Sequence, residues 1–125
     1  MKTQFVADFE AYMPAVFNDK PYGKPGLLSL ADEAGIDCCV VFPAGVPSDP
    51  RPLNADLLQE VVGESRILPG CLVNPTMGTS ASDDLKKCVD QGARTVKLMA
   101  AAHGYRVDST CTDPITVSYT HLTLP

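Results

Sequence analysis

Short apolar segments recur along the chain at intervals of about 30 residues, the length of a strand followed by a crossover helix. They occupy residues 5–9, 36–42, 67–73 and 95–99. The second, within "GIDCCVVFP", is nearly continuous, which is typical of a parallel strand buried on both faces. Pro69 and Gly70 interrupt the third. The pattern predicts four strands.

The segments between these strands have the apolar spacing of amphipathic helices. In "GLLSLADEAG" one helical face carries Leu27, Leu30, Ala31 and Ala34. Gly35 follows, where a helix commonly ends in a residue of positive φ. In "NADLLQEVVG" the pattern predicts Asn54 as the amino-terminal cap, and Gly63 comes after the apolar stripe.

A third helix is predicted in "SASDDLKKCVDQG". Ser80 or Ser82 is the expected cap, and Asp83 and Asp84 would lie in the first turn, where the helix dipole favours acids. Gly92 ends the segment. Three helices that each end in glycine before an apolar strand indicate an α/β fold.

Strands separated by crossover helices pair in parallel with right-handed connections. Two architectures fit: an open doubly wound sheet, or the first half of an eight-stranded barrel. The loops after the first two strands, "EAYMPAVFNDKPYGKP" and "PAGVPSDPRPLN", are long and rich in proline. Both folds build binding sites at this end of the sheet. A phosphate-binding glycine pattern is missing after the first strand, which weakens a nucleotide interpretation.

The composition limits the class of protein. With 125 residues, of which 45% are hydrophobic, the chain can build one core, so we expect one domain or part of one. The net charge of −5, with no cluster of basic residues, argues against a nucleic-acid partner.

The location of the protein is predicted from the same features. The apolar runs are too short to cross a bilayer, and "MKTQFVADFE" has acids where a secretory signal needs a hydrophobic region. We expect a cytoplasmic protein with no membrane partner. Five cysteines, two of them adjacent, suggest reduced thiols and neither a disulfide framework nor a zinc site.

Three stretches carry a resemblance to a known family: "LADEAGIDCCVVFPAG", "LNADLLQEVVGESRILPGCLVNP" and "DDLKKCVDQGARTVKLMAAAHGYRVD". Together they resemble the amidohydrolase-related metal-dependent hydrolases and decarboxylases. The likeness runs from about residue 4 to about residue 108, with order and spacing kept.

This resemblance implies a TIM-like (β/α)8 barrel, of which the chain is the first half, with about four parallel strands and the helices between them. It implies a small-molecule substrate (an amide, ester, lactone or carboxylate) and leaves room for a homo-oligomeric parent protein. A divalent metal, usually zinc, would activate water by lowering its pKa from about 15.7 towards 7. The other ligands of the family would follow residue 125.

The family's first metal ligands are a His-x-His pair at the end of strand one. In this chain the matching stretch is "DFEAY", which places Glu10 and Tyr12 there. Glu10 could supply an oxygen ligand, or it could be a solvated carboxylate. Tyr12 is a poor zinc ligand and more simply packs under the next loop. A barrel that has lost its metal is therefore a further reading.

Four other residues are candidates for the site. Lys97 alternates with the apolar residues of its strand. The resemblance implies a carbamylated metal bridge or a substrate-binding cation at this place, and the alternative is a snorkelling lysine or a structural ion pair. Asn74 could bind substrate or cap the turn before Pro75. His103 and Tyr105, in the loop after the fourth strand, could hold a substrate carboxylate or simply be exposed.

The last segment, "VSYTHLTLP", would suggest an edge strand. It also resembles a translated sequencing-library adapter, GTC TCT TAT ACA CAT CTG ACG CTG CCG, and the preceding adapter bases fit a codon for Thr116. We therefore expect residues 1–115 to be a truncated domain and residues 116–125 to be non-native. This expectation removes His121 from the candidate ligands.

A fragment of this kind is expected to be inactive and aggregation-prone or partly molten, because half a barrel has unpaired strand edges. The alternative is a complete small doubly wound module that binds or regulates without catalysis. That alternative needs an edge strand formed by the tail.

Overall fold

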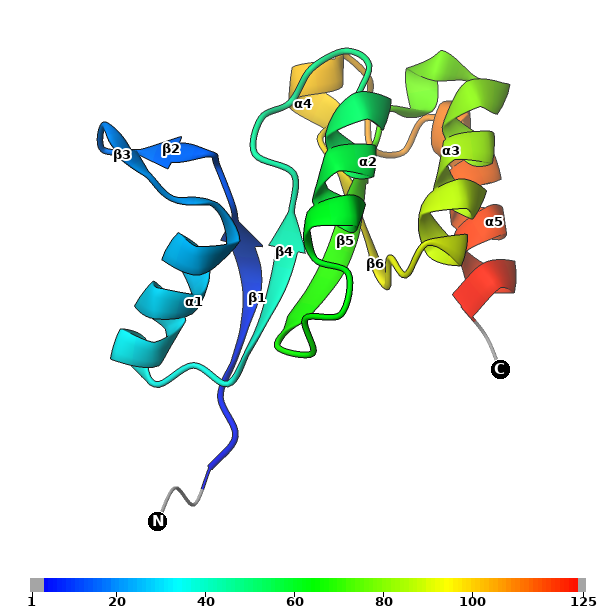
Figure 1. Ribbon diagram of the computed structural model, residues 1–125. Coiled ribbons are helices and arrows are strands. Elements are labelled where there is room, and N and C mark those ends of the chain that lie inside the picture. Colours follow the sequence, from blue (N-terminus) through cyan, green and yellow to red (C-terminus); the bar gives the residue numbers. More distant parts are fainter. Residues whose placement is uncertain (1–3, 124–125) are drawn as a thin grey trace.

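Four parallel strands form a curled sheet at the centre of the structure (Figure 1). A computed structural model describes residues 4–123. The strands lie side by side in the order β1 (Ala7–Tyr12), β4 (Cys38–Phe42), β5 (Ile67–Val73) and β6 (Thr95–Leu98). Each neighbouring pair is parallel. The α/β prediction with four parallel strands is confirmed.

Helices connect the strands and also follow the last of them, β6. The longer ones are α1 (Gly23–Ala34), α2 (Arg51–Glu60), α3 (Thr79–Asp90) and α5 (Asp113–Thr123). The shorter ones are α4 (Ala100–His103) and the 3-10 turns η1 (Pro75–Met77) and η2 (Thr110–Thr112). A small antiparallel hairpin, β2 (Val16–Phe17) with β3 (Lys20–Pro21), lies in the loop after β1. None of the helices in residues 4–123 is long and apolar enough to cross a membrane.

The connections distinguish the two predicted architectures. The strands follow one another in chain order, whereas a doubly wound sheet reverses its order at a switch point. Both apolar clusters use alternate residues of the central strands, Cys39 and Val41 in one and Cys71 and Val73 in the other. Since alternate residues share a face, the helices cover one face of the sheet. This is half of an α/β barrel, with the other face concave.

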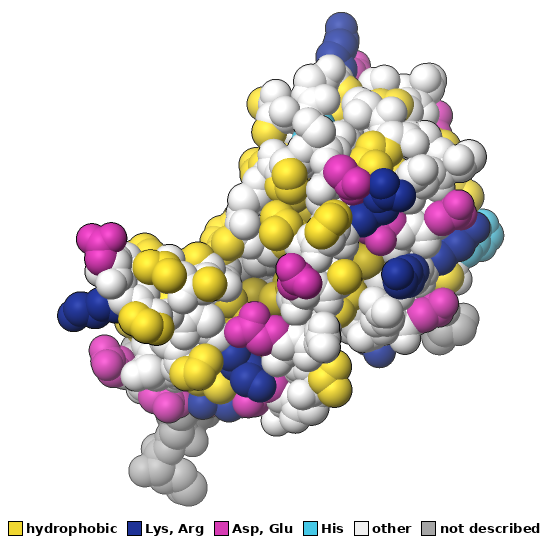
Figure 2. All heavy atoms as spheres, turned by 45° about the horizontal axis from the view of Figure 1, so that its top comes forward, with side chains coloured by type: hydrophobic (Ala, Val, Ile, Leu, Met, Phe, Trp, Pro, Cys, Tyr) yellow, Lys and Arg dark blue, Asp and Glu magenta, His cyan; other side chains and the backbone are white. Residues whose placement is uncertain are grey.

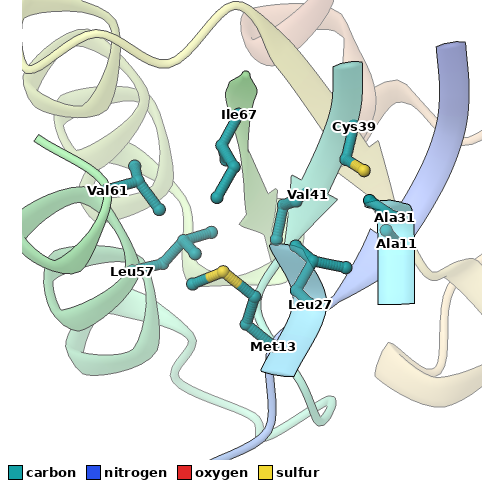
Figure 3. Close-up of a cluster of buried hydrophobic side chains, with 9 residues drawn as sticks. All are labelled: Ala11, Met13, Leu27, Ala31, Cys39, Val41, Leu57, Val61 and Ile67. Carbon is teal, nitrogen blue, oxygen red and sulfur yellow. The ribbon is translucent and has the colours of Figure 1, made fainter. Parts of the chain in front are cut away.

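Two clusters of buried side chains hold the helices to the convex face. The first joins β1, β4 and the start of β5 to α1 and α2 (Figure 3). Its members are Ala11, Met13, Leu27, Ala31, Cys39, Val41, Leu57, Val61 and Ile67. The second joins β5 to α2, α3 and α5, and comprises Leu58, Cys71, Val73, Ala81, Leu85, Cys88, Ala93 and Ile115.

The first strand begins later than predicted. It spans Ala7–Tyr12, two residues downstream of the expected start, because its pairing with β4 runs from Ala7 opposite Cys38 to Tyr12 opposite Phe42. The aromatic residues that suggested the strand are largely exposed, Phe5 at 72% and Phe9 at 77%. The small side chain of Ala11 is buried instead, under α1.

The predicted helix starts are wrong at two places. Asn54 lies inside α2, which begins three residues earlier, and its side chain bonds to β5 instead of capping. Ser80 and Ser82 lie inside α3, which begins at Thr79, so that Asp83 and Asp84 fall beyond the first turn.

The carboxyl end of α1 agrees with the prediction. Gly35 has φ +71°, and its N–H donates to carbonyls of the last turn.

The tail is a helix and not an edge strand. Residues 113–123 form α5, in which Ile115, Tyr119 and Leu122 recur at helical spacing and pack on the second cluster. His121 is exposed, and Pro125 lies outside the described residues. The edge strand that the doubly wound module needs is therefore absent from the described part of the tail.

The described cysteines are all free thiols. Cys71 and Cys88 are both buried, and a hydrogen bond between them, together with burial, raises the pKa of the Cys88 thiol well above its usual value. They act as small core side chains, as the sequence predicted.

Candidate functional site

The polar side chains that could bind a ligand or take part in catalysis meet on the concave face, at the carboxyl ends of the strands. The Lys97 ammonium, from β6, contacts the Glu10 carboxylate and the Tyr12 hydroxyl, both from β1 at the opposite edge of the sheet. The Tyr12 hydroxyl in turn donates to Glu10 Oε1 at 2.5 Å. Carboxyl ends of parallel strands are where barrels place their active sites. The structure thus brings together three of the residues singled out by sequence.

Backbone register explains why these side chains share a face. Tyr12 pairs with Phe42 across β1 and β4, and Leu72 pairs with Lys97 across β5 and β6. Paired residues on neighbouring strands point to the same side of a sheet. The curl of the sheet then lets the long Lys97 side chain reach across to β1.

Two aromatic rings surround the ammonium. Lys97 Nζ lies 4.9 Å from the ring centre of Tyr12 and 5.4 Å from that of Phe42. Both distances are within the range of cation–π attraction. Phe42 can take this place because Gly70 has no side chain: a Cβ there would lie 2.4 Å from Phe42 Cε1. Gly70 therefore determines where the ring lies.

Charge in this cluster is fixed by the contacts. The hydrogen bond from Lys97 holds the pKa of the Glu10 carboxyl below its ordinary value, with help from the hydrogen bond from Tyr12. Burial works to lower the pKa of Lys97, but hydrogen bonds to Glu10 and Tyr12 outweigh it and raise that pKa above its ordinary value. At neutral pH the cluster is an ammonium–carboxylate pair. Its lysine is 19% exposed and its glutamate 57%.

An apolar pocket of about 280 Å³ opens beside the ammonium. Its lining consists of Tyr12, Phe42, Pro43, Ala44, Gly45, Val46, Leu72, Lys97 and Met99. Lys97 supplies the formal charge of this lining. In Figure 2, where the carboxyl ends of the strands are turned towards the viewer, hydrophobic side chains lie among scattered charged ones. An apolar pocket with a few convergent polar groups is the usual form of a small-molecule site.

The wall of the pocket formed by residues 43–46 belongs to the loop between β4 and α2, and two predicted site residues hold this loop. Asn74 Nδ2 donates to the Ser48 carbonyl at 2.8 Å, and Asn74 Oδ1 accepts from the Thr76 N–H at 3.1 Å. His103 Nε2 lies 2.9 Å from the Pro47 carbonyl. Asn74 is therefore a turn cap, one of its two predicted roles, and a loop anchor as well.

Tyr105 lies outside the lining of this pocket, as do Asn74 and His103. Burial raises the pKa of the Tyr105 phenol, and the Tyr105 hydroxyl finds no hydrogen-bond partner among residues 4–123. His103 Nδ1 is likewise buried without a partner in that range. The structure does not bring these two side chains into the Lys97 cluster.

Sequence reasoning missed one supporting residue. The buried Asn54 side chain accepts from the Leu72 N–H and donates to the Leu72 carbonyl, both at 2.9 Å. It also donates to Asp84 at 2.9 Å. Pairing between β4 and β5 ends at Pro69, so the Asn54 amide replaces a strand partner for Leu72, which lines the pocket. An asparagine near a helix start indicates a cap, so no sequence signal pointed to this role.

The donor set of the cluster does not fit a zinc ion. Zinc sites are built from histidine, cysteine and carboxylate ligands. Here the groups are one carboxylate, one phenol and an ammonium that already contacts the carboxylate. Within residues 4–123 no three His, Cys, Asp or Glu side chains group closely enough to hold a metal.

Comparison with protein-family models, with curated proteins and with solved structures gives no match to this chain. The amidohydrolase resemblance therefore rests on the residues quoted for it and stays a prediction.

Proposed function

We propose that the chain is the first half of a (β/α)8-barrel enzyme that acts on small molecules, similar to the amidohydrolase-related hydrolases and decarboxylases. The observation that carries this proposal is the meeting of Lys97, Glu10 and Tyr12 at the carboxyl ends of a sequentially ordered parallel half-barrel. In barrels this end is the catalytic face, because the loops that follow the strands meet there.

In the proposed enzyme this half binds and orients the substrate. The apolar pocket holds the body of the molecule, and the Lys97 ammonium neutralises a negative oxygen at its edge. The loop held by Asn74 and His103 closes one side of the pocket against water. A water-activating group would have to come from the second half, so the fragment itself is proposed to be inactive.

The family resemblance would place a divalent metal, usually zinc, in the complete barrel. When bound, such an ion supplies activated water. The residues described here do not fit it, since Glu10 is already neutralised by Lys97. We therefore derive no step through a metal, and any such ligands would have to come from the proposed second half of the barrel.

The test is to recover the genomic sequence downstream of codon 115. We expect it to replace residues 116–125 with native sequence and to continue into four more strand–helix units. Histidine and aspartate at the ends of the new strands would support a hydrolase or decarboxylase. A stop codon directly after codon 115 would refute the proposal.

The activity of the recovered protein is then measured on small amides, esters, lactones and carboxylates. Replacing Lys97 by Met is expected to lower kcat/KM at least tenfold for an accepted substrate, since each tenfold is about 1.4 kcal/mol of transition-state stabilisation. Lys86→Met, on the exposed face of α3, is the matched control and is expected to leave kcat/KM unchanged.

A further inference from the structure

The surroundings of Lys97 also indicate which class of molecule the site binds. Its ammonium stands at the edge of the apolar pocket, flanked by the rings of Tyr12 and Phe42. Its carboxylate partner, Glu10, is more than half exposed and comes from outside the pocket lining. The lysine is thus the more buried partner of this ion pair, and the glutamate is the more exposed one.

The same contacts decide between the roles predicted for this lysine. Carbamylation needs a neutral amine that can attack carbon dioxide, and here two hydrogen bonds keep the amine protonated. Coordination of a metal by Glu10 would bring a second positive charge against the ammonium. The contacts favour a permanent cation over a metal ligand or a metal bridge.

We propose that Lys97, in place of a metal ion, supplies the positive charge of this half of the site and binds the carboxylate of a small molecule. The apolar body of that molecule occupies the pocket between Phe42, Leu72 and Met99. On binding, the ligand carboxylate replaces Glu10 at the ammonium, and the Tyr12 hydroxyl becomes free to donate to it. The inference deepens the proposed function, because it names the substrate class of the same site.

Carboxylate is favoured over phosphate by the form of the site. One ammonium and one hydroxyl match the single charge of a carboxylate, whereas phosphate sites add backbone N–H groups or an arginine fork. The remaining lining is apolar, which suits a carbon body and penalises a second charge.

The test titrates the 125-residue chain, in dilute solution and after treatment with a chelator, with benzoate and with its neutral analogue benzamide. Binding is followed by saturation-transfer NMR of the ligand, at a chain concentration below the micromolar range in which association is expected. We expect saturable benzoate binding at least tenfold tighter than that of benzamide, unaffected by the chelator. Lys97→Met is expected to remove this difference. Lys86→Met makes the same change of charge on the exposed face of α3 and is expected to preserve it.

Four results would overturn the inference. They are equal affinity for benzoate and benzamide, unchanged benzoate binding in Lys97→Met, competition by inorganic phosphate as strong as that by benzoate, and saturable zinc binding that is lost in Glu10→Gln. Circular dichroism of each variant shows whether it has folded. If a variant of the short chain does not fold, the same comparison is made in the complete protein.

The outcome is separable from that of the proposed function. Lysine-dependent benzoate binding by a chain whose gene stops after codon 115 would uphold this inference and refute the enzyme. A complete, active barrel in which Lys97→Met leaves benzoate binding unchanged would uphold the enzyme and refute this inference.

Discussion

At the scale of single residues, the site depends on side chains whose neighbours come from distant parts of the sequence. Lys97 and Glu10 are 87 positions apart, yet each sets the charge of the other. Gly70 matters for what it lacks, since the Phe42 ring fills the space of its missing side chain. Residue types alone carry none of these relations.

The first prediction concerns the acid titration of Glu10. Its pKa is held below the ordinary value of 4.5 by Lys97, so it binds its proton less readily in the folded chain than in the unfolded one. The stabilisation from this pair is present above pH 4.5 and is lost as the pH falls through the lower, folded pKa. NMR titration of the Glu10 carboxyl should show this shift, and Lys97→Met should return the pKa towards 4.5. Persistence of the shift in that variant would contradict the assignment.

The second prediction concerns the buried amide of Asn54. Asn54→Ala leaves the N–H and the carbonyl of Leu72 without their partner, and each such buried group costs about 1–3 kcal/mol. We expect urea denaturation in dilute solution to show a loss of this order in the free energy of unfolding. Gln59→Ala, at an exposed position of the same helix, is the control and should change it by less than about 0.5 kcal/mol. Equal effects of the two variants would rule out a stabilising role for the hydrogen bonds between Asn54 and Leu72.

At the scale of elements, the sequence identified the strands and the helices between them better than their ends. A near-continuous apolar run marked β4, as is typical of a parallel strand, and shorter or interrupted apolar runs marked β5 and β6. The limits of β1 and the caps of α2 and α3 were missed, because tertiary contacts override local preferences. Asn54 has the side chain of a cap, but a backbone 18 residues away offers it two buried partners.

The candidate site was predictable in part for the same reason. Alternation along a strand placed Lys97 on the face opposite Val96 and Leu98, and the position of Glu10 at a strand end is local information. That their side chains meet depends on the curl of the sheet, which no short stretch of sequence encodes. The loop-holding role of His103 was not foreseen, because its partner, the Pro47 carbonyl, is a backbone group.

The third prediction tests the helical tail. Val117 and Tyr119 would share one face of a strand, but they lie on opposite sides of a helix. Val117 is 55% exposed, whereas Tyr119 packs on the second cluster and its hydroxyl donates to the Arg94 carbonyl at 2.9 Å. Tyr119→Ala should lower the urea midpoint clearly, and Val117→Ala should leave it nearly unchanged. Similar losses in both variants would favour a strand.

At the scale of the whole molecule, the half-barrel leaves β1 and β6 as open edges of its four-stranded sheet. Large apolar side chains near these edges and on the concave face are exposed, among them Phe9 at 77% and Leu68 at 43%. Open edges and exposed apolar surface favour association between chains.

The fourth prediction follows from those edges. At micromolar concentrations and above, the chain as written should associate or show the broad thermal transition and dye binding of a partly molten state. Light scattering and calorimetry check this. The complete protein, if it closes the barrel, should be the control that melts cooperatively. A soluble monomer of the 125-residue chain with one cooperative transition would contradict the prediction.

All the strands of the sheet run in the same direction. The free edge of β1 and the free edge of β6 therefore differ, and each can pair in parallel with the other but not with its own kind. A partner edge can join β6 in parallel only if it has the character of β1. A second half-barrel could therefore close the ring only by rotation about the barrel axis, which brings both rims into line. A parallel contact of β1 on β6 that does not close the ring leaves one free β1 edge and one free β6 edge, so further half-barrels can add to it in an open series.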